Sequence, residues 1–331
     1  IKTDTYTLLL VIIINCIYKK NTTMKNLILL LFIPLVSFGQ EFKIEHKRND
    51  DKSVSFRYQK SKPNSVTAIL DFSFMSNTSS PRTIIQKLAK SQGSFIKLKP
   101  TNPDENIGFN YTYKHFNQTI NPTLDEDFVY ILPYKKGAKM NVEELGYLGK
   151  KYSNKKKPKG WKAYSFKSDV SQEIYPTRKG VVIEVIDKHS PDLTKTYSFY
   201  NKMNSVKIEH SDGTMANYSG FDKLKIYVKP GDIVYPQINK LGETTVFDNR
   251  GFHLINFSIS YISTISGVNI SNLKTNEQLE YVYVSPVFFE NGEIIILKKG
   301  FPYISDYDEE TLFQNFSKRQ IKKYKKGKPI D

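Results

Sequence analysis

Three blocks between residues 207 and 259 decide the fold of this chain. They read Lys207-Ile-Glu-His-Ser-Asp-Gly-Thr-Met-Ala-Asn-Tyr-Ser-Gly-Phe-Asp-Lys223, then Val228-Lys-Pro-Gly-Asp-Ile-Val234, then Gly251-Phe-His-Leu-Ile-Asn-Phe-Ser-Ile259. The first predicts a β-hairpin because Ser211-Asp-Gly213 is turn-forming, the second a tight turn into a strand, and the third a strand that carries a histidine. We therefore predict one antiparallel sheet over residues 175–260, with strands at Gly180–Val185, Ser205–His210, Met215–Tyr218 and His253–Ile259.

The fold class predicted for the rest of the chain is also mainly β, an antiparallel sheet or β-sandwich. The sequence holds 22 Tyr and 21 Phe, and residues 53–59, 66–74 and 109–113 are rich in aromatic and β-branched residues at near period-2 spacing. Asn291-Gly292 predicts a type I′ hairpin. Two short helices are expected, one from Ser80 as N-cap to Gly93, and one from Asp308 toward Lys318.

The N-terminal residues are typical of a secretory signal. Met24 to Gln40 has an early Lys25, an apolar run too short to span a bilayer, and small residues before a polar start. We expect residues 1–23 to be an over-extended start, residues 24–40 a signal peptide, and the protein to be exported to the periplasm or the exterior. The alternative is that residues 8–17 form a second apolar segment of a membrane anchor.

Composition and turn residues predict the remaining organisation. A polar stretch over residues 120–129 separates a β-rich N-terminal domain, residues 41–127, from a core at residues 128–260. Additional strands follow at 261–305, and a basic tail at 306–331. The one cysteine, Cys16, precedes the expected cleavage site, so a disulfide framework and a thiol catalyst are excluded after cleavage.

The charge is strongly basic. The whole chain carries +16, of which residues 1–40 contribute four lysines and one aspartate, so the remainder carries +13. With an export signal, the expected anionic partner is an envelope surface rather than nucleic acid. For each basic run taken alone, however, we favour a solvated loop or a disordered tail over a binding role.

Further blocks keep the same order upstream: Tyr130-Ile-Leu-Pro-Tyr-Lys-Lys-Gly137, Gly146-Tyr-Leu-Gly149, Ala163-Tyr-Ser-Phe166 and Tyr175-Pro-Thr-Arg-Lys-Gly-Val-Val-Ile-Glu-Val185. Together with the three blocks above, residues 130–260 resemble the β-sheet core (the duplicated hybrid motif) of the lysostaphin/LytM-type peptidoglycan zinc endopeptidases, in their secreted bacterial form. The resemblance implies a zinc ion held by two His and one Asp, with two further His residues acting on the attacking water.

By position, this chain departs from that metal-handling set. The three ligand positions fall on Asn154, Ser165 and Ile255, and one of the two catalytic positions falls on Gly220. Only His253 matches, at the other catalytic position, and we expect it to be inactive. Asn and Ser are weak neutral ligands and Ile has no donor atom. The resemblance therefore predicts a degenerate member with no metal and no cofactor.

The predicted function is a non-catalytic binding or regulatory module of the cell envelope. Its expected partners are a peptidoglycan peptide, a cell-wall hydrolase or another envelope protein, and no nucleic acid. The alternative is an active zinc metalloendopeptidase that cleaves peptidoglycan crosslinks, and a third class is a structural β-protein of the envelope. No phosphate loop, nucleophile elbow or dinucleotide fingerprint is present.

Overall fold

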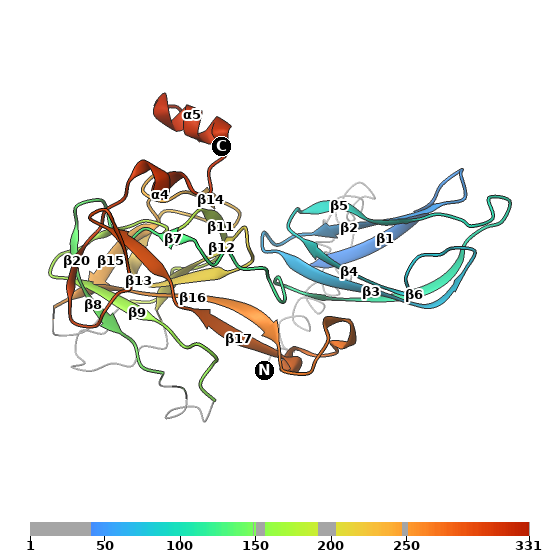
Figure 1. Ribbon diagram of the computed structural model, residues 1–331, viewed down its shortest axis with the longest axis horizontal. Coiled ribbons are helices and arrows are strands. Elements are labelled where there is room, and N and C mark those ends of the chain that lie inside the picture. The colour runs from blue at the N-terminus through green and yellow to red at the C-terminus, as the bar shows by residue number, and fades with distance from the viewer. Residues whose placement is uncertain (1–40, 148, 150–155, 191–202, 247–250, 331) are drawn as a thin grey trace, which may run out of the picture. The chain divides into compact units, whose positions relative to one another are not determined.

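The computed structural model describes residues 41–147, 149, 156–190, 203–246 and 251–330. The expected over-extended start and signal peptide lie outside these residues. The described part is built mainly from antiparallel strands, as predicted (Figure 1). None of its helices has the length and apolar character needed to cross a membrane.

The first six strands form two three-stranded sheets, ordered β1-β2-β5 and β4-β3-β6. Apolar side chains from both sheets belong to one hydrophobic cluster, so the two sheets enclose a common core. The strands are β1 Phe42–Arg48, β2 Val54–Lys60, β3 Val66–Ser76, β4 Thr83–Leu88, β5 Gln92–Leu98 and β6 Gly108–Phe116.

The helix predicted from Ser80 to Gly93 is wrong, because this segment holds strand β4. Thr83–Leu88 pairs antiparallel with β3, from Asp71 opposite Thr83 to Val66 opposite Leu88. Ile84 and Leu88, both buried, are four residues apart, a spacing that suits one face of a strand as well as one face of a helix. The β-branched run Thr83-Ile-Ile85 favours a strand, and the pairing with β3 stabilises it.

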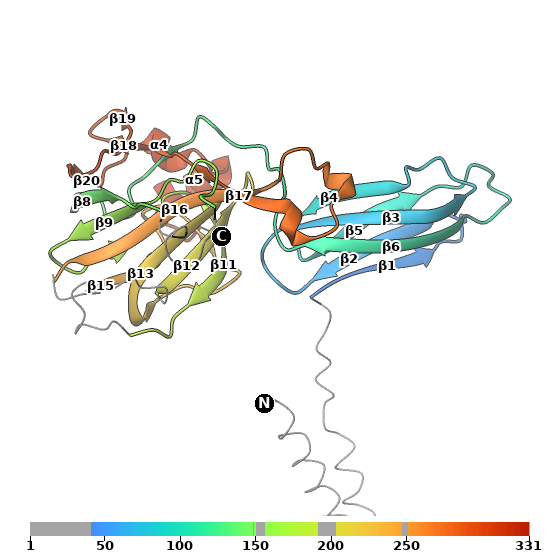
Figure 2. The same ribbon diagram turned by 90° about the horizontal axis from the view of Figure 1, so that it is seen from below.

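A larger sheet follows, ordered β14-β11-β12-β13-β15-β16-β9-β8-β20, with β10 on β15 and β17 on β16 (Figure 2). The four predicted strands of residues 175–260 are confirmed as members of this sheet. Its strands are β8 Lys139–Glu144, β9 Tyr164–Ser168, β10 Glu173–Ile174, β11 Gly180–Ile186, β12 Asn204–His210, β13 Met215–Ile226, β14 Ile233–Val234, β15 Gly242–Val246, β16 His253–Thr264, β17 Leu279–Val284 and β20 Pro302–Ile304.

The two faces of this sheet differ in chemistry. Strands β13 and β16 pair from Met215 opposite Ser260 to Ser219 opposite Asn256, and side chains alternate between faces along each strand. One face packs into the main core, with Ala216, Tyr218, Ile255, Phe257 and Ile259. The other, which we call the polar face, carries Ser205, Lys207, Asn217, Ser219, Ser165, Asn256, Ser258 and Ser260.

The C-terminal residues form a hairpin and two helices. Strands β18 Val287–Glu290 and β19 Glu293–Ile295 pair through Asn291 and Gly292, whose φ values of 49° and 84° match the predicted type I′ turn. Strand β18 also pairs parallel with the two-residue strand β7 Val129–Tyr130. The helix predicted from Asp308 toward Lys318 is present as the shorter α4 Glu309–Phe313, with Asp308 as its N-cap, and α5 Lys318–Lys325 follows it in the basic tail. Two short 3₁₀ turns, η2 Ile270–Asn272 and η3 Asn276–Gln278, precede β17.

A third hydrophobic cluster, which we call the junction, joins the first strands to the large sheet. Strand β3 contributes Ile69 to the junction. The even-numbered residues of this strand face the first core, and Ile69 lies on the opposite face. Ile69 and Phe116 lie in the same cluster as Met215, Ile262 and Leu273. The backbone amide of Ser65 adds a hydrogen bond of 2.7 Å to the Glu209 carboxylate on β12. Residues 41–331 accordingly make one compact unit.

Candidate functional site

A row of small polar side chains crosses the polar face at its centre. Ser165 on β9 lies directly opposite Asn256 on β16, and Asn256 lies opposite Ser219 on β13. The row continues to Ser205 on one side and Glu143 on the other. Directly opposed side chains on neighbouring strands are about 5 Å apart at Cβ, so these groups form a continuous line of hydrogen-bonding atoms.

The structure separates two of the predicted ligand positions. Ile255 pairs with Phe166 and is fully buried in the main core, whereas Ser165 belongs to the polar face. The residue that faces Ser165 is Asn256, one position later in the strand. Because a step of one residue reverses the face of a strand, Ser165 and Ile255 cannot meet at one groove.

The retained histidine lies at the start of β16. His253 is opposite Ser168 on β9 and Val246 on β15, and its Nδ1 atom is 3.4 Å from the carbonyl oxygen of Thr244. It is two residues from Ile255 and therefore shares the face of that side chain rather than the face of Ser165.

Gly220 occupies an irregular position in β13. Its φ is +133°, and the pairing with β12 passes from Ser219 opposite Ser205 directly to Phe221 opposite Asn204. A Cβ atom at this position would lie 2.5 Å from the carbonyl oxygen of Leu254. The close approach of β16 requires glycine here, so a histidine side chain does not fit in this backbone.

The donor set around this region does not suit zinc. Of the predicted ligand positions, Asn154 lies outside the described residues, Ser165 offers a neutral hydroxyl, and Ile255 offers no donor. Asn256, which takes the place opposite Ser165, offers a neutral carboxamide, far weaker toward zinc than imidazole or carboxylate. Among the described residues no group of three or more His, Cys, Asp or Glu is placed to hold a metal ion. The arrangement is suited to hydrogen bonding rather than to Lewis-acid chemistry.

The sequence itself indicates that Ile255 and Asn256 lie on opposite faces of β16. Along β16, Ile255, Phe257 and Ile259 alternate with Asn256 and Ser258. This period-2 pattern assigns Ile255 to the apolar face, whereas alignment to a family motif assigns it to a ligand position.

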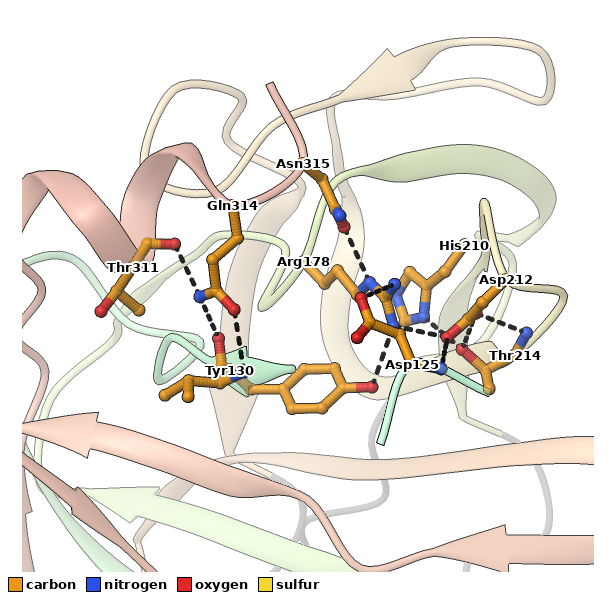
Figure 3. A network of polar contacts seen from close by, with 10 residues as sticks. Asp125, Tyr130, Arg178, His210, Asp212, Thr214, Thr311, Gln314 and Asn315 are labelled. Carbon is orange, nitrogen blue, oxygen red and sulfur yellow. Dashed lines mark hydrogen bonds and ion pairs between the residues drawn. The ribbon is translucent and has the colours of Figure 1, made fainter. Parts of the chain in front are cut away.

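A second polar site, missed by the sequence analysis, centres on Arg178, the largest fully buried side chain (Figure 3). Its Nη1 atom donates to Asp212 at 2.7 Å, its Nε atom to Asn315 at 2.9 Å, and its Nη2 atom approaches Asp125 at 3.4 Å. The guanidinium carbon lies 4.0 Å from the centre of the Phe128 ring. We call these residues the Arg178 cluster.

His210 extends the Arg178 cluster, and its protonation follows from the hydrogen bonds. The Thr214 hydroxyl donates its only hydrogen to Asp212 at 2.7 Å, so it accepts from His210 Nδ1 at 2.8 Å. The Nε2 atom of His210 is buried and has no hydrogen-bond partner among the described residues. Burial and the nearby Arg178 cation hold the pKa of His210 well below its ordinary value of 6.5. The imidazole is therefore neutral, with its proton on Nδ1.

Near Arg178 and His210, the pKa values of two buried carboxyl groups shift in opposite directions. Burial disfavours the charged form of Asp212, but the attraction of Arg178 and the hydrogen bonds from Thr214 outweigh it and lower its pKa. Burial raises the pKa of Glu209, against the hydrogen bond from Ser65 and the attraction of Lys60.

The Arg178 cluster connects the C-terminal segment to the large sheet through hydrogen bonds and ion pairs. Arg178 lies in the bend before β11, Asp212 in the β12–β13 turn, Asp125 in the segment before β7, and Asn315 two residues after the end of α4. Gln314 adds hydrogen bonds to both the amide and the carbonyl of Val129 (Figure 3). Arg178 is 1% exposed, so a ligand cannot reach it, and loss of one of its acidic partners would leave its buried charge less well compensated. No sequence motif marks it.

Comparison with known proteins found no matching family model and no matching curated protein. Among solved structures, one described as the M23 metalloprotease pseudoalterin from the deep sea is 14% identical, covering 54% of this chain and 99% of its own, with a TM-score of 0.29. A putative M23 peptidase from Pseudomonas aeruginosa is also 14% identical, covering 60% of this chain and 90% of its own, with a TM-score of 0.24. The chain is similar to two M23 peptidase structures at these low scores.

Proposed function

We propose that this protein is a non-catalytic binding module of the cell envelope, which holds a polar cell-wall polymer against the polar face of its large sheet. The observation that carries the proposal is the pair Asn256 and Ser219, which are half-buried on the polar face, whereas Ser165 beside them is 2% exposed and only flanks the binding groups. Hydroxyl and carboxamide groups both donate and accept hydrogen bonds, and as neutral groups they bind without requiring a charged ligand.

Two further features support this function. The resemblance of residues 130–260 to peptidoglycan endopeptidases points to the cell wall as the source of the polymer, and the export signal expected at residues 24–40 would bring the protein to it. The net charge of +13 outside residues 1–40 would strengthen attachment to an anionic wall at low salt.

Co-sedimentation of the full-length protein with purified peptidoglycan sacculi tests the proposal. We expect binding that weakens with added salt, and no release of soluble fragments. Asn256→Leu removes hydrogen-bonding groups from the centre of the row and should weaken binding by about tenfold, since two net hydrogen bonds amount to roughly 1.4 kcal/mol or more.

Asn110→Leu is the matched control, because Asn110 is an exposed strand residue on β6, away from the large sheet. It should bind as the unchanged protein does. Release of wall fragments that a chelator abolishes would instead support the zinc endopeptidase alternative. Absence of sedimentation at low salt would exclude the proposed function.

A further inference from the structure

A cavity of about 360 Å³ opens at one end of the polar face. Asn217 and Ser260 reach it from β13 and β16, Tyr281 from β17, and Gln118 from the segment after β6. Small-molecule sites range from about 300 to 1,000 Å³, so the cavity has room for a ligand of the size of one or a few sugar rings.

One wall of the cavity is formed by residues 62–64, which precede β3, and residues 117–118, which follow β6, and hydrogen bonds from side chains to backbone carbonyls hold it in place. The side chain of Asn64 donates a hydrogen bond to the backbone carbonyl oxygen of Asn117 at 2.8 Å. The hydroxyl of Thr67 donates one to the backbone carbonyl oxygen of Gln118 at 2.8 Å. The Glu209 carboxylate holds the neighbouring Ser65 amide. This wall is preorganised, which lowers the entropic cost of binding.

The polar side chains that line the cavity have few hydrogen bonds to the rest of the protein, so their donors and acceptors remain available for a ligand. Asn117 has only a long contact, 3.4 Å, to Glu41. The side chains of Gln118, Asn217 and Ser260 make no hydrogen bond or ion pair with any other part of the chain that the structure describes. Each carboxamide presents a donor and an acceptor side by side, the pattern that matches two adjacent hydroxyls on a sugar ring.

Two other features narrow the ligand class. Tyr281 is 52% exposed, which leaves part of its ring available to pack on the C–H face of a sugar. The lysines of the cavity are already paired: Lys207 with Glu184 at 2.6 Å, and Lys62 with Glu41 at 2.7 Å. A phosphate or a carboxylate would have to compete with these partners, whereas a neutral ligand would not.

We infer that this cavity binds a neutral saccharide, with Tyr281 as the stacking surface and the amides of Gln118 and Asn217 as hydroxyl-binding groups. The inference rests on the proposed function and refines it, because it assigns one end of the polar face to the glycan part of a wall polymer rather than to its peptide part.

Calorimetric titration of the full-length protein with chitotetraose, cellotetraose and tetraglutamate tests the inference. The neutral oligosaccharides should bind and tetraglutamate should not. Tyr281→Ala should weaken oligosaccharide binding at least tenfold, and Tyr281→Phe, which keeps the ring, should stay within about threefold of the unchanged protein. Asn217→Leu should weaken binding as Tyr281→Ala does.

Tyr227→Ala is the matched control, since Tyr227 is equally exposed at 52% but does not line the cavity. It should bind as the unchanged protein does. The inference is overturned if neither oligosaccharide binds, if tetraglutamate binds instead, or if Tyr281→Ala and Tyr227→Ala behave alike. Retained binding to sacculi in any of these cases would leave the proposed function standing and remove only the saccharide site.

Discussion

At the scale of single residues, His210 gives the protein a specific sensitivity to acid. The folded state keeps this buried imidazole neutral next to Arg178, while the unfolded chain takes up a proton near pH 6.5. At His210 the unfolded state therefore binds more protons below that pH, so this residue contributes a decrease in the free energy of unfolding as the pH falls from about 6.5, opposite to the contribution of Glu209, whose pKa is raised in the folded state. His210→Asn, which keeps a donor for Thr214, should flatten this dependence between pH 6 and 4, by up to about 1.4 kcal/mol per pH unit.

Urea unfolding at a series of pH values measures this effect. Between pH 7.5 and 9 the imidazole is neutral in both states, so the difference in stability between the variant and the unchanged protein should be constant there. Equal slopes for the two proteins below pH 6 would show that His210 is protonated in the folded state.

At the scale of the element, the irregularity in β13 depends on Gly220. Gly220→Ala places a methyl group at a left-handed φ and against the Leu254 carbonyl, so it should cost roughly 2–4 kcal/mol. Gly292→Ala is the control, because Gly292 also has a positive φ but nothing within 4 Å of an added Cβ, and it should cost only about 1 kcal/mol. The two costs are compared by chemical denaturation, and similar values would mean that β16 can move away from β13.

At the scale of the whole molecule, the junction ties the first two sheets to the large one. Ile262 is 2% exposed in this cluster, and Ile262→Ala should remove about 2–5 kcal/mol of packing between the two parts. We expect calorimetry to show one unfolding transition for the unchanged protein and two for this variant. Ile208→Ala, equally buried but inside the main core, should lower the melting temperature without dividing the transition.

Two transitions in the unchanged protein, or a divided transition in Ile208→Ala, would contradict this account of the junction. The first result would mean that the Ile69–Phe116 side of the junction contributes too little to couple the two cores.

The sequence by itself determined those elements whose signals are local. The strands predicted at Ser205–His210 and His253–Ile259 agree with the period-2 alternation within them, and the Asn291-Gly292 hairpin follows from two residues that tolerate positive φ. The helix start at Asp308 follows from its side chain, which accepts from the Thr311 amide. Each of these signals lies within a few residues of the structure that it predicts.

Only the tertiary structure decided what depends on pairing between distant segments. Residues 83–88 became a strand because β3 offered a partner, which a pattern common to helices and strands does not reveal. The register that sets Asn256 opposite Ser165, and buries Ile255, is fixed by side chains about 90 residues apart that compete for the core. The Arg178 cluster gathers residues 125, 178, 212 and 315, whose proximity no local pattern encodes because the folded sheet alone brings them together.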